Sequence, residues 1–464
     1  MNADRDLTDR LAATLAEAGQ ALPYAPAGTV AGVRRRFVRR RRLRAVAAAV
    51  AALLALTVSS IALRPMAAPT ATPGGHLRMW ALTDVERNPG LRGCLDDAGV
   101  PVELTTFGND TYQQLMAAPG APGQRPDVFE NWGGADLGRQ AHAGTVADLT
   151  GVAGDAADLF LPGVMAGGQV GGRQYGLPVT GTQPIVLFYD KRLFAEAHLS
   201  PPRTYAELLS AVDTFRARKV TPIALAGAAR WPALMYLMYL TDRLGGPQVF
   251  ADIAAGRPGA WRHPAVREAA RLTQQLVRRG AFGEPGDALN LETGAATGML
   301  TRGEAAMQLM GSWEYGAQAA DDPAFAATGL GWTPFPSVAG GAGDPADLVG
   351  VPANYLSVDA GSPYRAEAAQ FVARTVTSDA FLDGLLAAGE VPAVRDLEPR
   401  LAGHPHAEFA RFVHRLAVAA PSFTLAWDQA LPRPVASVLL DRTRQLFQLT
   451  ITPDEFVAAM AATA

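Results

Sequence analysis

Residues 173–209 read RQYGLPVTGTQPIVLFYDKRLFAEAHLSPPRTYAELL, and residues 210–231 continue SAVDTFRARKVTPIALAGAARW. Prolines and glycines near the start of this stretch predict a loop before the apolar run Ile185–Phe188, which is typical of a buried strand. A second apolar run, Pro222–Leu225, predicts another strand and leads through small residues to Trp231. The stretch therefore begins with a loop that precedes the first strand and ends with a loop that follows the second.

A helix is predicted between these two strands. Two prolines lead into Thr204, and Glu207 follows three residues later, which is the spacing of a capping box at a helix start. The apolar residues behind the cap recur at helical spacing and share one face. They are Tyr205, Leu208, Leu209, Val212 and Phe215. A strand, a helix and a strand in succession indicate an α/β protein.

The same alternation extends over the rest of the chain after residue 76. The predicted strands are Leu77–Leu82, Val102–Phe107, Asp127–Glu130, Ile185–Tyr189, Pro222–Leu225, Ala305–Met310 and Tyr355–Val358. Predicted helices include Val266–Val277, Ala366–Val376 and a last helix that begins at Thr452 with Pro453 and Glu455. A chain of 464 residues that is 49% hydrophobic is long enough for more than one domain.

Charge is distributed unevenly along the chain. Residues 34–44 contain eight arginines and residues 1–33 sum to −2, so the net charge of −3 leaves −9 for residues 45–464. A mildly acidic body does not favour nucleic acid as a partner. The single cysteine, Cys94, excludes an intramolecular disulfide and a CxxC metal site.

An uncharged run of 19 residues, Ala45–Leu63, follows the arginines. As a helix it would be about 28 Å long, close to the thickness of the hydrocarbon core of a membrane. The arginines before it place residues 1–44 in the cytoplasm by the positive-inside rule, and everything after Leu63 outside. We therefore expect a cytoplasmic basic tail (1–44), a single-pass signal anchor (45–63) and a linker (64–75) before an extracellular domain.

Two features of this leader leave its processing open. Arg34-Arg35-Arg36 resembles a twin-arginine export signal, and Ser60-Ile61-Ala62 offers a small-x-small cleavage site. A retained anchor is favoured because the apolar run is longer than most signal-peptide cores. Residues 4–22 have an apolar face at helical spacing, and both a short amphipathic helix and a solvated tail are consistent with it.

Several motifs in fixed order resemble the extracellular solute-binding proteins of carbohydrate ABC importers, the maltose-binding-like family. The resemblance begins with YGLP at 175–178 and a strand that ends in Tyr189-Asp190-Lys191, where the family usually has Tyr-Asn-Lys. It continues through DVFENWGG at 127–134, RGEAAMQLMGSWE at 302–314, GWTPFPS at 331–337, VGVPANYLSV at 349–358 and ITPDEF at 451–456. No single motif is diagnostic, but the ordered set covers roughly 380 residues, the size of one domain pair.

This resemblance implies a two-lobed, periplasmic-binding-protein-like (type II) fold with discontinuous lobes. Lobe one is expected at 76–180 and 349–395, and lobe two at 182–348 and 396–464. The chain would cross between the lobes near residues 177–182 and again near 349–354.

A sugar site needs flat aromatic side chains for the apolar faces of the rings and polar groups for the hydroxyls. Trp132 follows a predicted strand and precedes two glycines, and with Glu130 and Asn131 it is expected to face the ligand. The alternative is a turn with a partly buried tryptophan. Trp313, beside Glu314, stands where the family's Gly-x-Trp supplies a stacking platform, so it is the strongest candidate.

Further candidates come from other loops. Trp231 is a second stacking candidate, although a tryptophan before an apolar helix is often core. Trp427 and Asp428 lie in a proline-flanked irregular stretch, where a carboxylate could accept two hydroxyl protons. Asp84, with Thr83 and Glu86, ends the first strand. Thr182, Gln183 and Asn354 are polar residues near the predicted crossings, where turn chemistry alone would also explain them.

The predicted function is that of a receptor. It would capture a sugar or oligosaccharide between two lobes and deliver it to the permease subunits of an ABC importer. It would be a monomer, would use no cofactor and would catalyse no reaction; His404 and His406 are a weak metal signal. One alternative is an exported glycoside hydrolase, for which Glu130 and Glu314 are the carboxylates to test. Another is a sugar receptor coupled to a signalling kinase.

Overall fold

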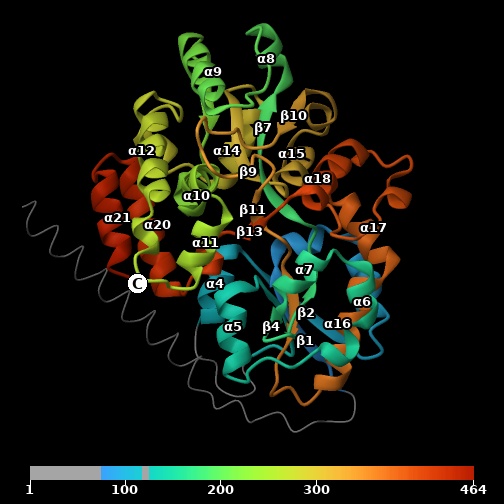
Figure 1. The fold of residues 1–464 in the computed structure, drawn as a ribbon. Helices are drawn as coiled ribbons and strands as arrows, with labels where there is room; N and C mark the ends of the chain where they lie inside the picture. The colour runs from blue at the N-terminus through green and yellow to red at the C-terminus, as the bar shows by residue number, and fades with distance from the viewer. Residues whose placement is uncertain (1–74, 118–124, 464) are drawn as a thin grey trace, which may run out of the picture. The chain divides into compact units, whose positions relative to one another are not determined.

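The computed structural model describes residues 75–117 and 125–463 (Figure 1). The predicted tail, the predicted anchor and nearly all of the predicted linker lie outside these residues. None of the helices in the described ranges has the length and apolar character needed to cross a membrane. The described residues belong to one compact unit, which contains two separate mixed sheets.

The first sheet contains the strand that begins the described chain. Its strand order is β2 (Val102–Phe107), β1 (Leu77–Leu82), β3 (Val128–Asn131), β12 (Tyr355–Val358) and β6 (Leu177–Pro178). β1 runs parallel to β2 and β3, whereas β12 is antiparallel to both β3 and β6. The carboxyl ends of the three parallel strands therefore lie at one edge of the sheet, where ligands of open α/β sheets bind. A two-stranded ribbon, β4 (Gln169–Val170) with β5 (Arg173–Gln174), lies outside this sheet.

The second sheet is built around a long buried strand. Its order is β13 (Phe423–Leu425), β11 (Leu348–Val351), β7 (Gln183–Asp190), β9 (Ala305–Gly311) and β8 (Thr221–Ala224), and β10 (Leu330–Thr333) also pairs with β7. β7 is the strand predicted at 185–189, lengthened by two residues at its start and one at its end. Its apolar residues are buried on both faces because helices cover both sides of the sheet, as Figure 1 shows for α10 and α18.

Helices surround each sheet. Around the first sheet lie η1 (Thr83–Arg87), α3 (Pro89–Asp96), α4 (Asn109–Ala117), α5 (Gly134–His142), η2 (Thr150–Val152), α6 (Gly154–Leu159), α7 (Pro162–Gly167), α16 (Arg365–Thr377) and α17 (Asp379–Ala387). Around the second sheet lie α8 (Lys191–Glu196), α9 (Tyr205–Ala217), η3 (Gly227–Ala229), α10 (Trp231–Gly245), α11 (Pro247–Ala254), η4 (Ala260–Arg262), α12 (Pro264–Arg278), α13 (Pro285–Ala288), α14 (Thr293–Thr301), α15 (Glu314–Asp321), η5 (Phe325–Gly329), η6 (Glu398–Leu401), α18 (Ala407–Ala419), α19 (Trp427–Ala430), α20 (Arg433–Phe447) and α21 (Pro453–Ala461).

Local sequence signals locate many of these elements well. The predicted strands at 77–82, 102–107 and 355–358 coincide with β1, β2 and β12. Both predicted capping boxes are present, with Thr204 accepting from the Glu207 amide and Thr452 from the Glu455 amide. The predictions did not include β11 and β13, because short strands in glycine- and proline-rich stretches have little periodicity.

The chain passes between the two sheets through three neighbouring segments. The first joins β6 to β7, the second joins β11 to β12, and the third follows α17. Hydrogen bonds tie these segments together: the Thr182 amide donates to the Val391 carbonyl at 2.8 Å, and the Asn354 amide donates to Thr180 Oγ1 at 2.8 Å. We define the first sheet with its helices as lobe one and the second as lobe two. The lobe boundaries drawn from the sequence remain our proposal.

Candidate functional site

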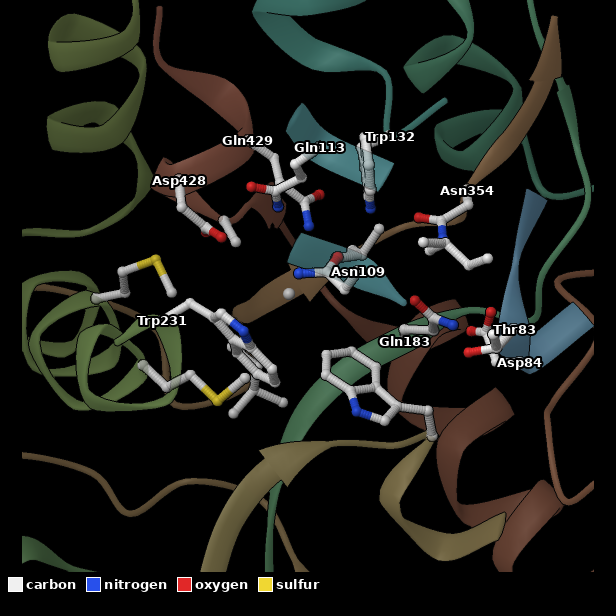
Figure 2. Close-up of a pocket in the computed structure, with 18 residues that line it drawn as sticks. Thr83, Asp84, Asn109, Gln113, Trp132, Gln183, Trp231, Asn354, Asp428 and Gln429 are labelled. Atoms are coloured by element: carbon white, nitrogen blue, oxygen red, sulfur yellow. The ribbon is translucent and has the colours of Figure 1, made fainter. Parts of the chain in front are cut away.

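A cavity of about 180 Å³ lies where the two lobes meet (Figure 2). The strand-to-helix connections after β1 and β3, the start of α4 and the segment before β12 form its lobe-one side. Its lobe-two side is formed by residues of β7, β11, α10 and α19 and by Trp313, which lies between β9 and α15. The lining residues are Leu82, Thr83, Asp84, Asn109, Gln113, Trp132, Gln183, Ile185, Trp231, Met235, Met238, Trp313, Gly350, Val351, Asn354, Ala426, Asp428 and Gln429.

Three half-buried tryptophans give this cavity its flat apolar walls. Trp231 and Trp313 belong to lobe two, and their ring centroids are 6.0 Å apart with an interplanar angle of 58°. Trp132 belongs to lobe one, and Figure 2 shows it across the cavity from Trp231. A flat, polyhydroxylated ligand placed between them would contact indole rings from both lobes.

The turn after β3 fixes the position of Trp132. Asn131 Oδ1 accepts a hydrogen bond from the Gly133 amide at 2.9 Å, and Gly133 has a φ of 77° that favours glycine. Tyr112 packs edge-on against the indole, with ring centroids 5.4 Å apart. The Tyr112 hydroxyl in turn donates to the Glu130 carbonyl at 2.7 Å. The orientation of Trp132 is thus held by α4 and by the end of its own strand.

The backbone at the end of β9 holds Trp313. Its indole lies directly over Gly311, where any Cβ would be 1.9 Å from the ring. Ser312 Oγ donates to the Thr182 carbonyl at 3.1 Å, which ties this turn to the first passage between lobes. The next residue, Glu314, is buried and accepts from Thr297 Oγ1 at 2.7 Å. Burial raises the pKa of Glu314 to about 7 although Thr297 and Gln318 donate hydrogen bonds to it.

Trp231 begins α10, and an unusual backbone conformation precedes it. Arg230 has a φ of 65° and a ψ of −45°, a region that non-glycine residues rarely adopt. Its guanidinium pairs with Asp441 of α20 at 2.7 Å. Pro232 follows at the second helical position, so the chain turns sharply and presents the indole at the helix start.

Polar side chains complete the lining, and several of their atoms have no partner in the described residues. Asp84 Oδ1, Asn354 Oδ1 and Gln429 Oε1 are buried oxygens without a hydrogen bond. A buried polar atom without a partner costs about 1–3 kcal/mol, so each favours a ligand group that donates to it. Asn354 is held by its other side, because its Nδ2 donates to Glu130 Oε1 at 2.7 Å.

Three carboxyl groups, those of Asp84, Glu130 and Glu390, interact with one another beside the cavity and the passages between the lobes. Glu130 accepts from the Leu82 amide at 2.8 Å, and Glu390 accepts from the Gly181 amide at 3.1 Å. Burial and the nearby Asp84 carboxyl raise the pKa of Glu130 to about 8 and that of Glu390 to about 7. Burial also raises the pKa of Asp84, although the charge of Arg87 opposes this shift.

The comparisons with known proteins agree with this geometry. The sequence pattern of the family "Bacterial extracellular solute-binding protein" matches residues 96–380, more than half of the chain. The chain belongs to this family of extracellular solute-binding proteins. Two uncharacterized ABC transporter extracellular-binding proteins of Pyrococcus horikoshii are 26% identical over 247 residues and 24% identical over 207 residues. The chain spans about half the length of these curated relatives, 54% and 45%, and the alignments take in 52% and 44% of this chain.

Solved structures of other solute-binding proteins share the two-lobed fold. A structure from a study of xylan utilization by Caldanaerobius polysaccharolyticus has a TM-score of 0.75 and 28% identity, over 84% of this chain and 100% of that one. A chitin oligosaccharide binding protein has a TM-score of 0.73 and 23% identity, over 84% of this chain and 98% of that one. The predicted fold class, an α/β protein with two lobes, is therefore confirmed.

The cavity of this solute-binding protein brings together six of the residues predicted to bind the ligand. They are Asp84, Trp132, Trp231, Trp313, Asn354 and Asp428. Thr83 and Gln183, which were further candidates from the sequence, also line the cavity. Glu86, predicted together with Thr83, lines a different groove beside α3. Burial raises the pKa of Asp428 to about 6. The role of each residue in binding is a proposal taken up below.

The structure places the five other predicted residues behind the lining. Glu130, Asn131, Thr182 and Glu314 are at most 3% exposed, and Trp427 is fully buried against Phe250 and Trp261. Glu130 and Asn131 support lining residues, and Glu314 adjoins Trp313. Each of the five lies within two residues of a lining residue in the sequence, but its side chain is buried behind the lining.

Sequence reasoning did not find four of the polar and flexible lining residues. Asn109 and Gln113 lie one helical turn apart at the start of α4, directly after β2. Their spacing at i and i+4 after a strand was a usable signal. Met235 and Met238 extend along α10 from Trp231, but this helix is buried all round, so no periodicity distinguishes a cavity-facing side.

A second cavity adjoins the first beyond Trp132 and Trp231, which line both. Across it Arg433 of α20 reaches lobe one. Its Nε donates to Asp136 Oδ2 at 2.7 Å and its Nη1 donates to the Gln113 carbonyl at 2.8 Å. Although burial opposes the effect, Arg433 and Arg139 hold the pKa of Asp136 below its ordinary value. In the described residues no group of three or more His, Cys, Asp or Glu is placed to hold a metal ion.

Proposed function

We propose that this chain is an extracytoplasmic receptor that captures a sugar or oligosaccharide between its lobes and delivers it to the permease of an ABC importer. The observation that carries the proposal is the interlobe cavity, where three indoles from two lobes surround a set of hydrogen-bonding side chains. Indole rings cover the apolar faces of a sugar, and the polar groups bond its hydroxyls.

Lobe closure explains how such a site would hold its ligand. Trp132 and Asn354 come from lobe one, whereas Trp231, Trp313 and Asp428 come from lobe two. A ligand that contacts both sets binds the closed form better than the open form, so it shifts the equilibrium toward closure. The three passages between the lobes would act as the hinge. The closed form would then be the one that a permease recognises.

The comparisons support a carbohydrate as the ligand class. Of two similar structures, one comes from a study of xylan utilization and the other is a chitin oligosaccharide binding protein. The second cavity beyond Trp132 and Trp231 adds space for more than one ring, in agreement with an oligosaccharide. The predicted membrane anchor at 45–63 would keep the receptor beside its permease, and a monomer is sufficient for this role.

We further propose that binding occurs without chemistry. Glycoside hydrolysis needs two carboxyl groups on either side of the reacting bond. The two carboxylates considered for this role, Glu130 and Glu314, are both 1% exposed and do not line the cavity. Their hydrogen bonds to Asn354 and Thr297 fit a supporting role for each.

The test is titration of the full-length chain with a library of mono- to tetrasaccharides, followed by tryptophan fluorescence and calorimetry. We expect saturable binding of at least one sugar, a change in tryptophan emission and unchanged sugar on chromatography. Accumulation of hydrolysis products, lost in Glu130→Gln or Glu314→Gln, would overturn the binding role. Failure of every sugar in the library to bind would remove carbohydrate as the ligand class.

A further inference from the structure

The titratable side chains in the cavity lining are all acidic. Asp84 contributes a carboxyl group from lobe one and Asp428 contributes one from lobe two. Among the described residues that line this cavity, none is Lys, Arg or His. A ligand enclosed there contacts acidic groups from both lobes and no compensating cation.

The nearby cations are outside this lining. Arg87 acts on Asp84 through its charge, but its side chain lies on the exposed last turn of η1. Arg230 and Arg433 line the adjoining cavity, and each pairs with a carboxylate of its own, Asp441 and Asp136. An anionic group in the first cavity would therefore find no unpaired cation within its walls.

The unpartnered hydrogen-bonding atoms of the lining also disfavour an anionic group on the ligand. The unpartnered atoms at the cavity, Asp84 Oδ1, Asn354 Oδ1 and Gln429 Oε1, are all oxygens that accept. A ligand satisfies them only by donating O–H or N–H groups. A carboxylate, phosphate or sulfate has no proton to donate and would leave these oxygens unpaired.

Two buried carboxyls behind the lining add to this acidic environment. Glu130 bonds the side chain of Asn354, and Glu390 bonds the Gly181 amide in the first passage. Both interact electrostatically with Asp84. Where they ionise, they make the potential at the cavity more negative, and the low dielectric of the site strengthens the effect on an enclosed charge.

We propose that this site selects sugars by charge: it accepts neutral and amine-bearing sugars, excludes sugars that carry a carboxylate, phosphate or sulfate, and uses Asp84 and Asp428 as the specificity-determining residues. This inference rests on the proposed sugar-binding function and adds the chemical class of the sugar. The shared property of the accepted ligands is a set of hydrogen-bond donors without a negative charge.

The experiment compares matched sugars on the full-length chain at pH 7.5. Each set contains a neutral sugar, its uronic acid and its amino derivative, such as glucose, glucuronic acid and glucosamine, together with the disaccharides of each type. Dissociation constants come from calorimetry. In any set whose neutral member binds, we expect the acidic member to bind at least tenfold more weakly and the amino member to bind at least as well.

Variants then test whether the two aspartates cause the selection. Asp84→Asn and Asp428→Asn keep the shape of each side chain and remove its charge, and circular dichroism checks the fold of each variant. We expect the ratio of acidic to neutral affinity to rise by about tenfold or more in the double variant. Asp155→Asn, an exposed carboxylate on α6 away from the cavity, is the matched control and should leave the ratio unchanged.

The outcomes separate this inference from the proposed function. Acidic sugars that bind as tightly as neutral ones would overturn charge selection while leaving the receptor role intact. Exclusion that persists unchanged in both single variants would show that shape, and not charge, rejects the acidic sugars. If no sugar of any charge binds, the proposed function itself fails.

Discussion

Trp313 and Trp427 show how differently two tryptophans in similar loops are used. Trp313 is half-buried, lies flat over Gly311 and lines the cavity. Trp427 is fully buried, and its ring stacks on Phe250 with centroids 4.3 Å apart. Each lies two residues beyond the end of a strand, β9 or β13, so the two positions are alike in local structure. The difference comes from packing against other elements: Trp313 lines the cavity as a proposed platform for the ligand, whereas Trp427 is a core residue.

Replacement of Trp313 by alanine tests the proposed platform. We expect Trp313→Ala to weaken sugar binding by about 1–3 kcal/mol, because the ligand loses apolar contact area and stacking. Trp313→Phe should recover part of this loss. Calorimetry measures both, and the melting temperature checks that each variant is folded. An unchanged dissociation constant in a folded Trp313→Ala chain would contradict the assignment.

Trp427→Ala should act on stability. Removal of a fully buried indole leaves a cavity between Phe250 and Trp261, which destabilises a fold by about 3–5 kcal/mol. Urea unfolding followed by far-ultraviolet circular dichroism measures this loss. A variant as stable as the native chain but defective in sugar binding would show that Trp427 is a ligand contact after all.

At the scale of elements, α20 contacts lobe one across the cavity from its own lobe. Its Arg433 bonds Asp136 of α5 and the Gln113 carbonyl of α4, both in lobe one. These bonds link the two lobes beside the cavity and would be lost if the lobes separated. In the proposed receptor, Arg433 would therefore favour the closed arrangement without any direct contact with the ligand.

We expect Arg433→Ala to weaken sugar binding by about 1 kcal/mol, or roughly fivefold, because a partly exposed ion pair and a hydrogen bond to a carbonyl are modest contributions. Stopped-flow fluorescence should show a faster dissociation rate and a nearly unchanged association rate. The control is Arg442→Ala on the same helix, whose side chain bonds Gln445 within α20. Equal affinities for the native chain and Arg433→Ala would exclude the role in closure.

At the scale of the whole molecule, the three passages between the lobes meet beside the cavity. Gly181 packs so closely on Val391 that a Cβ would lie 2.5 Å from the Val391 carbonyl oxygen. Glu130 bonds Asn354 of the second passage, and Glu390 of the third bonds Gly181 of the first. The three passages and the cavity therefore share buried carboxyls, which connects protonation to the stability of this region.

The sign of the pH effect follows from the raised pKa values. Glu130 has a pKa of about 8 in the folded chain, against 4.5 for an ordinary glutamate. Between these two pH values the folded chain binds the proton more tightly than the unfolded chain, so this group's stabilising effect falls as pH rises from about 4.5 to 8. Glu390, with a pKa of about 7, adds to the same trend.

Glu130→Gln removes this titration while keeping the shape of the side chain. We expect the free energy of unfolding of the native chain to fall more steeply between pH 5 and pH 8 than that of Glu130→Gln. Urea unfolding at a series of pH values measures both slopes. Parallel curves for the two proteins would show that Glu130 titrates normally in the folded chain.

Strands, caps and the order of motifs were readable from the sequence because they depend on neighbouring residues: β1, β2, β12 and the two capping boxes lie where periodicity and spacing predict them. The two-lobed fold was readable from the ordered motifs. The set of residues that line the cavity could not be predicted from the sequence, because it depends on which segments the three passages between the lobes bring together. Asn109, Met238 and Gln429 line the cavity with Trp132 from distant parts of the chain, whereas Glu130 and Trp427, each within two residues of a lining residue, are buried behind it. Side-chain direction at the end of a strand is set by packing against both lobes, and no local pattern encodes that packing.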